Sequence, residues 1–263
     1  MQLNGETQLF PILGDPIAQV RSPQFLSEIL ARRGINAIVP PLHVKPVDLS
    51  AVVAVLRTMQ NVGGIVVTIP HKVTCLAHCD EVSERAAFVG SVNIIRKTIE
   101  GKLVGDNVDG IGYLDGIAKE GGQVAGKRFL LVGVGGAGSA VAFEVLQRGA
   151  SYLAIHDLNT ERRDAIIQSL AAKFPNKVGV GSPDPTGFDF VANVTPVGMK
   201  AGDPYPVEVS KLQSTQFVAD AITRPKVSPL VAYARQVGCN SMVGAGMFNA
   251  EAEILVDFMT GLA

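Results

Sequence analysis

The stretch Arg128-Phe-Leu-Leu-Val-Gly-Val-Gly-Gly-Ala-Gly138 decides the fold of this chain. Its apolar first half is typical of a strand that is buried on both faces of a parallel sheet. The second half, Gly133-x-Gly135-x-x-Gly138, leads into a helical pattern that begins at Ser139. Glycines at this spacing permit a tight turn, close approach of the backbone to a pyrophosphate and close helix–strand packing. We therefore expect a dinucleotide site at a helix N-terminus, where free N–H groups attract phosphate. The alternative is a glycine turn in an ordinary strand–helix–strand unit.

A second predicted strand, residues 152–156, ends at Asp157, which lies 24 residues after Gly133. A carboxylate near this spacing accepts hydrogen bonds from the ribose 2′-OH and repels a 2′-phosphate. Leu158 follows, at a position where an arginine would favour NADP. The sequence therefore predicts NAD as the preferred cofactor. Arg162 and Arg163 lie close enough to compensate, and their alternative role is the solvated first turn of the next helix.

Composition excludes several classes of partner. The 263 residues are 47% hydrophobic and 18% charged, which is enough for a sizeable core, and the net charge is −1. Nucleic acids and anionic membranes require a basic footprint that this chain lacks. The sequence has no apolar run of membrane-spanning length and no signal-peptide pattern at its start. We expect a cytoplasmic protein without nucleic-acid or membrane partners, as a monomer or homodimer.

The cysteines do not predict a metal site. Cys75, Cys79 and Cys239 cannot close a disulfide framework. Cys75-x-x-His78-Cys79 offers three possible ligands within five residues, without a distant second pair. Zinc sites usually combine two separated pairs. We therefore interpret this segment as a packed helix.

The first hundred residues alternate predicted strands with predicted helices. Strands are expected over 9–13, 37–44, 64–69, 92–95 and 102–104. A helix is expected from Ser22, with Ser22 as its cap and Pro23 at its first position. A further helix is expected from Leu49, whose apolar neighbours recur at helical spacing. This pattern predicts a small α/β domain.

The second half follows the same alternation. After a junction at 105–122, strands are expected over 128–132, 152–156, 177–180, 188–192 and 217–219, with helices over 230–235 and 247–259. The last helix is apolar enough to pack against another domain. The prediction is a substrate domain of residues 1–104 and 240–263, and a dinucleotide domain of residues 105–239, with a cleft between them.

Lys72 and Asp109 are the candidates for proton transfer. Lys72 lies just past the end of a predicted buried strand, at the sheet edge where α/β proteins bind ligands. Asp109 lies at the junction between the domains. A lysine held near a carboxylate in a closing cleft can exchange a proton with an alcohol. The alternative is that a surface lysine and a helix-capping aspartate have no role in catalysis.

The sequence resembles the shikimate/quinate dehydrogenase family in seven segments that occur in the family's order and span nearly the whole chain. These segments are 14–23 (GDPIAQVRSP), 67–72 (VTIPHK), 90–93 (GSVN), 105–110 (GDNVDG), 133–137 (GVGGA), 193–199 (NVTPVGM) and 244–247 (GAGM). The resemblance implies an N-terminal α/β substrate domain and a C-terminal NAD(P)-binding Rossmann domain, with the last helix returning to the N-terminal domain. It also implies reversible hydride transfer between a nicotinamide and the ring C–OH of a cyclic hydroxy acid.

The resemblance also assigns roles to residues. It implies that Lys72 and Asp109 are the catalytic pair. The residues implied or considered for substrate binding are Ser22, Thr68, Asn93, Thr223, Glu251 and Arg21. The residues implied for cofactor binding are Gly133, Val134, Gly135, Gly136, Ala137, Asp157, Leu158, Arg162, Thr195, Pro196, Ala221 and Gly244.

Four substrate positions depart from the family pattern. Val20 replaces a serine that holds the substrate carboxylate, and Val66 replaces an asparagine. Thr223 replaces a tyrosine and Glu251 replaces a glutamine. We expect the same chemistry on a changed substrate, with Arg21 or Thr223 needed to hold a carboxylate. Glu251 is expected to accept a hydrogen bond from a hydroxyl, or from an amino group of an aminated analogue. The alternative is that Val20 and Val66 only pack and that Glu251 points to solvent.

Three alternative functions are considered for this chain. The first is an NAD-preferring dehydrogenase of shikimate, quinate or a close relative. The second is an NAD-binding sensor or partner protein with little turnover, which the altered substrate positions favour and the Lys72–Asp109 pair disfavours. A third, a methylene-tetrahydrofolate or malic-type dehydrogenase, lacks support from segments 14–16 and 193–199.

Overall fold

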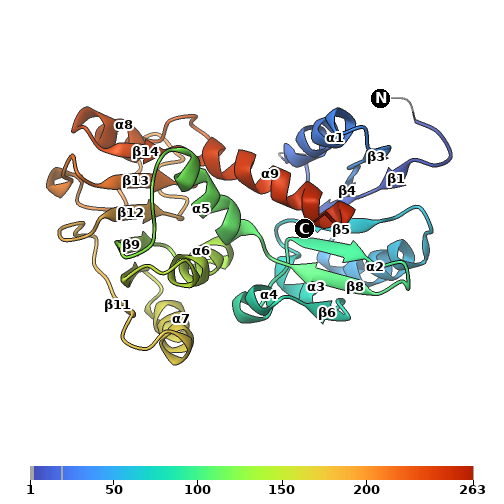
Figure 1. Cartoon of the computed structure of the whole chain (residues 1–263), viewed down its shortest axis with the longest axis horizontal. Coiled ribbons are helices and arrows are strands. Elements are labelled where there is room, and N and C mark those ends of the chain that lie inside the picture. The colour runs from blue at the N-terminus through green and yellow to red at the C-terminus, as the bar shows by residue number, and fades with distance from the viewer. Residues whose placement is uncertain (1–2, 19, 263) are drawn as a thin grey trace. The chain divides into compact units, whose positions relative to one another are not determined.

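The computed structural model describes residues 3–18 and 20–262. The chain forms two compact units, of which the first comprises Met1–Val108 with Ala252–Ala263 and the second Asp109–Glu251. Figure 1 colours the chain from blue to red, and the second unit covers the segments from green to orange-red. The last helix, α9 (Gly244–Thr260), begins in the second unit and ends in the first, as the sequence predicts.

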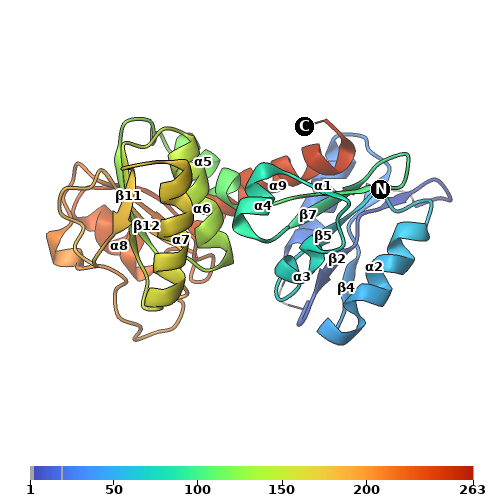
Figure 2. The same cartoon turned by 90° about the horizontal axis from the view of Figure 1, so that it is seen from below.

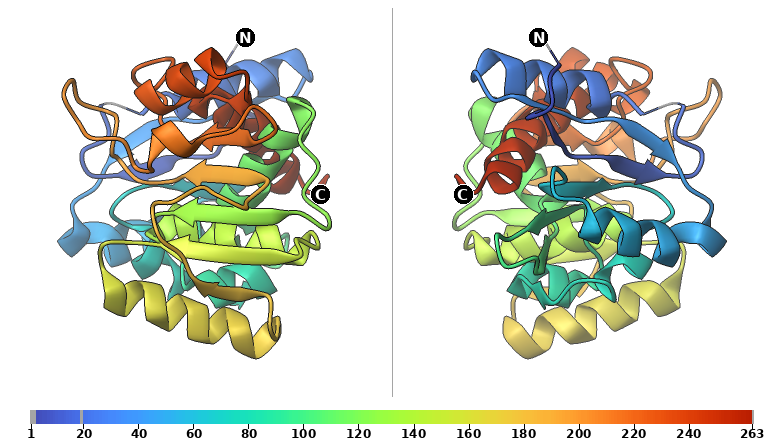
Figure 3. Two further views of the ribbon diagram at one scale, coloured as in Figure 1. Left: turned by 90° about the vertical axis from the view of Figure 1, so that its left-hand side faces the viewer. Right: turned by 90° about the vertical axis from the view of Figure 1, so that its right-hand side faces the viewer.

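The second unit is built on a parallel sheet. Its strands are β9 (Arg128–Val132), β10 (Tyr152–His156), β11 (Val178–Val180), β12 (Phe190–Asn193), β13 (Phe217–Asp220) and β14 (Asn240–Met242). Their spatial order within this unit is β11-β10-β9-β12-β13-β14, and every neighbouring pair is parallel. The left view of Figure 3 shows these strands side by side. The strand order reverses between β9 and β12, where dinucleotides bind in this architecture.

Helices of the second unit cover this sheet. They are α5 (Asp109–Lys119), α6 (Gly136–Gln147), α7 (Thr160–Lys173) and α8 (Pro229–Gln236), with a short 3-10 helix, η2 (Val209–Lys211). The α6 helix packs on β9 and β10, α7 on β10 and β11, and α8 on β13 and β14. Figure 2 shows α6 and α7 on the same side of this unit. The α6 helix starts at Gly136 rather than at the expected Ser139, because Gly135 already has extended cap geometry.

The first unit contains a mixed sheet. Its strands are β2 (Ile12–Gly14), β4 (Pro41–His43), β5 (Gly64–Val67), β6 (Glu81–Val82), β7 (Ile94–Lys97) and β8 (Leu103–Asp106). Among its described residues the order is β4-β2-β5-β7-β8-β6, and β7 is antiparallel to both β5 and β8. A separate short pair joins β1 (Gln8–Leu9) to β3 (Ala37–Ile38). The remaining elements are α1 (Ser22–Arg32), η1 (Pro46–Asp48), α2 (Leu49–Thr58), α3 (Lys72–Leu76) and α4 (Glu84–Val89).

Prolines shorten the strands that periodicity predicts. The expected strand over 9–13 is two strands, β1 and β2, that join different sheets around Pro11. The expected strand over 37–44 likewise divides into β3 and β4 at Pro40 and Pro41. Proline has no N–H to donate to a ladder, so a strand that includes one is interrupted or confined to an edge.

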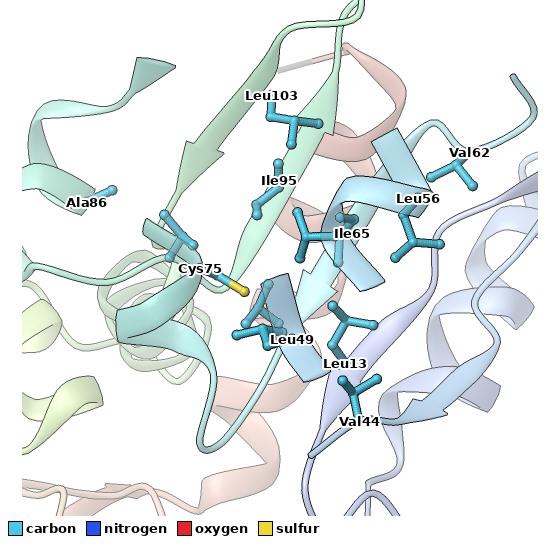
Figure 4. Close-up of a cluster of buried hydrophobic side chains, with 13 residues drawn as sticks. Leu13, Val44, Leu49, Leu56, Val62, Ile65, Cys75, Ala86, Ile95 and Leu103 are labelled. Carbon is cyan, nitrogen blue, oxygen red and sulfur yellow. The ribbon is translucent and has the colours of Figure 1, made fainter. Parts of the chain in front are cut away.

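One face of the mixed sheet carries a dense apolar core. The buried side chains come from α2, the sheet, α3 and α4, and include Leu49, Ile65, Ile95, Leu103 and Cys75. Figure 4 shows them converging between α2 and the strands, with the Cys75 sulfur among them. Cys75 is fully buried, and burial raises the pKa of its thiol to about 12. Cys75 therefore acts as a packed side chain, and no metal-like cluster of histidine, cysteine or acidic side chains occurs among the described residues.

The end of α9 is held to the first unit by charge. Arg33 contacts Asp257 and Glu253 at 2.5 Å each, and Arg32 contacts Glu253 at 2.6 Å. The Arg96 guanidinium lies 5.7 Å from the centre of the Phe258 ring. Hydrogen bonding to Asp257, with Glu253 adding to it, raises the pKa of Arg33 despite partial desolvation. Exposed pairs are individually weak, but this group links α1 to the last two turns of α9. No helix in the described part of the chain has the length and apolarity to cross a membrane.

The backbone contact at Gly64 gives a test of the mixed sheet. A Cβ at Gly64 would lie 2.3 Å from the carbonyl oxygen of Ile95, while a Cβ at Gly5 would meet nothing within 4 Å. Gly64→Ala should therefore lower the free energy of unfolding by about 2 kcal/mol, through forced separation of β5 and β7. Gly5→Ala is the matched control and should change it by less than about 0.5 kcal/mol. Urea unfolding followed by circular dichroism measures both, and equal midpoints would contradict the tight packing.

Candidate active site in two halves

The first half of the site lies at the carboxyl ends of β2 and β5. The Thr68 N–H donates to the Leu13 carbonyl, which carries Thr68 past the end of β5 toward β2. A Cβ at Gly14 would lie 2.6 Å from the Thr68 methyl group, so Gly14 is needed to admit Thr68 beside it. Because the ends of parallel strands share one edge of a sheet, Thr68 lies where such sheets bind ligands.

Lys72 is the first residue of α3, immediately beyond this edge. Its carbonyl accepts the N–H of Val92, which ties the start of α3 to the segment that carries Asn93. The preceding His71 is buried, and its Nε2 lies 2.7 Å from the Val44 carbonyl oxygen. A carbonyl oxygen only accepts, so Nε2 carries the proton. The structure therefore fixes the backbone of Lys72 from both sides and brings Lys72, Thr68 and Asn93 together in one unit.

Asn93 is buried between β5 and β8. Its carbonyl accepts the Val67 N–H, and its own N–H donates to the Asp106 carbonyl. The Asn93 Oδ1 accepts the N–H of Val108 at 3.0 Å. Asp109 follows Val108, is itself buried, and is the first residue of both α5 and the second unit. The residue before the predicted catalytic carboxylate is thus anchored to a predicted substrate residue.

The loop at 20–22 differs from the expectation. The α1 helix begins at Ser22, its cap position is Arg21, and no side chain caps it. The prediction that Ser22 caps this helix is therefore wrong, because Arg21 already has helical backbone angles. Arg21 is exposed, and Ser22 and Val20 are partly buried.

Two predicted substrate residues belong to the second unit. Thr223 is exposed in the loop after β13. Glu251 lies on α9 against Gly112 of α5, where a Cβ on the glycine would come within 2.6 Å of the Glu251 Cβ. Gly112 therefore sets how closely α9 approaches α5, and with it the position of the Glu251 backbone.

The second half of the site is the glycine turn after β9. Gly133 has φ +92°, a conformation that favours glycine, and its N–H donates to the His156 carbonyl. A Cβ at Gly138 would lie 2.1 Å from the Gly133 carbonyl oxygen, so α6 packs directly on the turn. At Gly135 and Gly136 a Cβ would meet nothing within 4 Å. This open side next to a helix N-terminus fits the pyrophosphate of a dinucleotide.

Asp157 is held beside this turn. Its Oδ2 accepts the Val134 N–H at 2.8 Å, and its Oδ1 accepts the Asn159 N–H at 2.8 Å. Nη2 of Arg162 lies 2.9 Å from both oxygens. Burial alone would raise the pKa of Asp157, but the two backbone bonds and Arg162 outweigh it, so the pKa is lowered. The carboxylate therefore stays ionised, and Leu158 beside it is 90% exposed.

The strands on the other side of the turn contribute a polar network that sequence reasoning missed. Nδ2 of Asn193 donates to Asp220 at 3.1 Å, and Thr195 Oγ1 donates to Asn193 Oδ1 at 2.7 Å. Asp220 also accepts from Ser228 Oγ, and burial raises its pKa. The available signal was a polar residue at the end of each of two apolar strands, β12 and β13.

This network brings predicted cofactor residues to the glycine turn. A Cβ on Gly133 would lie 2.5 Å from the Thr195 methyl group, so Thr195 contacts the turn directly. Pro196 follows it and is exposed. A Cβ on Gly244 would lie 2.6 Å from the Ala221 carbonyl oxygen, which places the start of α9 against the loop after β13.

The fold and the candidate site define a class of protein: a parallel α/β unit of the dinucleotide-binding type is joined to a smaller α/β unit. Lys72 begins the α3 helix, and Asp109 begins the α5 helix. Residues 12–95 match the family model described as the shikimate dehydrogenase substrate binding domain. A shikimate dehydrogenase (NADP(+)) of Lysinibacillus sphaericus is 31% identical over 96% of this chain and 92% of its own length. The chain belongs to the shikimate dehydrogenase family, whose curated members are oxidoreductases that act on a CH–OH group with NAD(P).

Solved structures share this fold. The 5-ketofructose reductase of Gluconobacter sp. strain CHM43 superposes with a TM-score of 0.90 at 29% identity, over 97% of this chain and 93% of that chain. The quinate dehydrogenase of Corynebacterium glutamicum in complex with NAD superposes with a TM-score of 0.88 at 25% identity, over 97% and 94% of the two chains. The two-domain α/β fold expected from the sequence is therefore confirmed.

Two glycines of the turn should behave differently when replaced. Gly138→Ala drives a Cβ into the Gly133 carbonyl and should lower the free energy of unfolding by about 2 kcal/mol. Gly135→Ala has room in the protein, and its φ of −66° suits alanine, so stability should stay within about 0.5 kcal/mol. Its new methyl group occupies the open side of the turn, so NAD affinity should fall about tenfold or more. Thermal unfolding and calorimetric titration with NAD separate the two effects. Unchanged NAD binding by Gly135→Ala would remove the turn from the cofactor site.

Proposed function

We propose that this protein catalyses reversible hydride transfer between a nicotinamide cofactor, preferably NAD, and the ring C–OH of shikimate, quinate or a related cyclic hydroxy acid. The observation that carries the proposal is the anchoring of Lys72, Thr68 and Asn93 at one sheet edge, with Asp109 directly following Val108, whose N–H donates to Asn93. The glycine turn supplies the cofactor half.

Lys72 and Asp109 would carry the proton chemistry. The bound nicotinamide supplies the hydride acceptor in oxidation and the hydride donor in reduction. In oxidation, the uncharged Lys72 amine takes the proton of the reacting hydroxyl as its carbon loses hydride, and the resulting ammonium leaves its proton to solvent. In reduction, the Lys72 ammonium gives that proton to the carbonyl oxygen. Asp109 accepts a hydrogen bond from the same hydroxyl and fixes its direction, as a general acid–base pair requires.

The substrate should be held by fewer polar groups than the family pattern provides. Val66 is 3% exposed within β5, where it pairs in register with Ile12 and Ile94, so it packs in the sheet. Thr68, Asn93 and Ser22 remain in the first unit for the ring hydroxyls. Each substrate oxygen left without a partner costs about 1–3 kcal/mol. Shikimate should therefore bind weakly unless Arg21 or Thr223 holds its carboxylate. Glu251 supplies an acceptor for a hydroxyl or an amino group.

A second candidate substrate class is a neutral polyhydroxy ketone. Val20 has no hydroxyl to give a carboxylate, which is the observation that favours it. The 5-ketofructose reductase that superposes on this chain is named for such a substrate. The proton-transfer roles of Lys72 and Asp109 would be the same, because a ring ketone and a sugar ketone need the same proton on oxygen.

The cofactor assignment has two parts, which are the binding of a nicotinamide dinucleotide and the choice between NAD and NADP. Family membership supports NAD(P). For the choice between the two, the ionised Asp157 and the uncharged Leu158 support NAD, because a carboxylate repels the 2′-phosphate of NADP. The curated relative is named for NADP(+), and two cations near Asp157, Arg162 and Arg163, favour a phosphate. Arg162 already pairs with Asp157, so we assign the preference to NAD.

An absorbance assay at 340 nm tests the function. We expect NAD-dependent turnover with at least one of shikimate, quinate and an aminated analogue in oxidation, or a ketose in reduction. Lys72→Met should lower kcat by about 10²–10⁴-fold, because it removes the proton-transfer group, while the Kd for NAD stays unchanged. Thr74→Val, an exposed change on the same helix, serves as the control. Tight NAD binding without turnover of any compound would favour the sensor alternative.

A single charge change tests the cofactor preference. Asp157→Asn keeps an oxygen that can accept the Val134 N–H but removes the negative charge. The ratio of kcat/KM for NAD to that for NADP should fall by about tenfold or more, since a like-charge contact is removed. Arg162→Gln should move the same ratio in the opposite direction, because it leaves the Asp157 charge uncompensated. A ratio that Asp157→Asn does not move would remove Asp157 from cofactor choice.

A further inference from the structure

Asp106 is a buried carboxylate for which the proposed mechanism has no use. It ends β8 with its side chain 2% exposed. It accepts hydrogen bonds from Ser83 Oγ, from Arg85 Nε at 2.8 Å and Nη2 at 2.5 Å, and from the N–H of Asn107 at 2.7 Å. A buried charge is tolerated when it is paired and its lone pairs are filled, and Arg85 and Ser83 from the start of α4 do both.

The backbone of this segment is bound to the substrate side of the sheet. The Asp106 carbonyl accepts the Asn93 N–H at 2.9 Å, and Asn93 Oδ1 accepts the Val108 N–H at 3.0 Å. Between them, Asn107 Nδ2 donates to Ser91 Oγ at 3.0 Å. The segment 106–108 is therefore tied to 91–93 at three successive residues. Its next residue is Asp109.

We infer that Arg85 is a positioning residue for the active site and acts through Asp106. Arg85 reaches Asp106 with two N–H groups of its planar guanidinium, so it fixes the direction of the carboxylate as well as neutralising it. The Asp106 carbonyl then holds the backbone of Asn93 in place, and the Asn93 side chain holds the backbone of Val108, the residue before Asp109. Arg85 is not among the residues predicted to bind substrate or cofactor. The inference rests on the proposed function only in taking Asn93 and Asp109 as active-site groups.

The first unit contains a matched control pair. Arg57 Nη2 lies 2.7 Å from Asp80 Oδ2, and that oxygen accepts the N–H of Leu103 at 2.7 Å. This pair joins a helix to the opposite end of the same strand, β8. Arg57→Gln thus removes an arginine from an aspartate that anchors β8, without touching the segment 106–108.

The test compares Arg85→Gln, Arg85→Lys and Arg57→Gln in the full chain. Hydrogen–deuterium exchange of the segment 105–109 should become at least several-fold faster in Arg85→Gln, with an intermediate rate in Arg85→Lys and the native rate in Arg57→Gln. With the compound that the wild type oxidises or reduces, kcat should fall about tenfold in Arg85→Gln, because a small displacement of reacting groups is costly. The Kd for NAD should stay within twofold, since the glycine turn lies in the other unit.

A double variant separates positioning from stability. Arg85→Gln alone leaves a buried charge unpaired and should lower the unfolding temperature, whereas Arg85→Gln with Asp106→Asn leaves no buried charge and should recover most of it. The double variant should still show fast exchange over 105–109 and a lowered kcat. Full recovery of kcat together with stability would overturn the inference. Native exchange over 105–109 in a folded Arg85→Gln protein would overturn it too, whichever substrate the wild type accepts, and the 340 nm assay of the wild type judges the proposed function separately.

Discussion

Among the glycines of the described residues, the tightest backbone approach is that of α6 to the turn after β9. The Gly133 carbonyl occupies the place where a side chain at residue 138 would begin. Because no side chain intervenes, the helix N-terminus opens directly onto the turn, and the turn adopts a φ that glycine tolerates. Two further contacts depend on this geometry: the Val134 N–H reaches Asp157, which directly follows β10, and the Thr195 methyl group, two residues after β12, lies against Gly133. The predicted cofactor half of the site is therefore one backbone arrangement, to which the loops after both neighbouring strands contribute side chains.

The substrate half follows a different rule. The backbones of the residues predicted to act there are fixed by hydrogen bonds: Lys72 through Val92, and Asn93 through Val67 and Asp106. The mixed direction of the sheet makes this possible, since antiparallel β7 brings its first residues to the edge where parallel β2 and β5 end. Residues from a strand start and from strand ends thus meet at one edge, which a purely parallel sheet does not allow.

The sequence predicted the elements that local residue patterns define, and it missed the groups that are defined by hydrogen-bond partners distant in the sequence. Apolar runs located β9 and β10 to the residue, and the glycine spacing located the turn. Strands over 9–13 and 37–44 were too long because periodicity does not register a proline that interrupts the ladder. The β6 strand has only two residues, both exposed, so it leaves no apolar signal. Asp106, Arg85 and the Asn193–Asp220 pair escaped notice because each is defined by a partner at least 20 residues away.

The departures in this chain from the family pattern fall on residues that act through side chains alone. Val20 and Thr223 lie in loops that no described sheet ladder includes, so their replacement leaves every ladder intact. Val66 keeps its place in β5 by packing. Lys72, Asn93 and Asp109 are different, because each begins or precedes an element whose hydrogen bonds also build the fold. Substitutions at Val20, Thr223 and Val66 thus leave the architecture as it is. A change to the local backbone of Lys72, Asn93 or Asp109 would instead disturb hydrogen bonds that build the fold. This separation gives a physical reason for finding the proposed proton-transfer pair, Lys72 and Asp109, intact beside altered residues at the positions predicted to bind substrate.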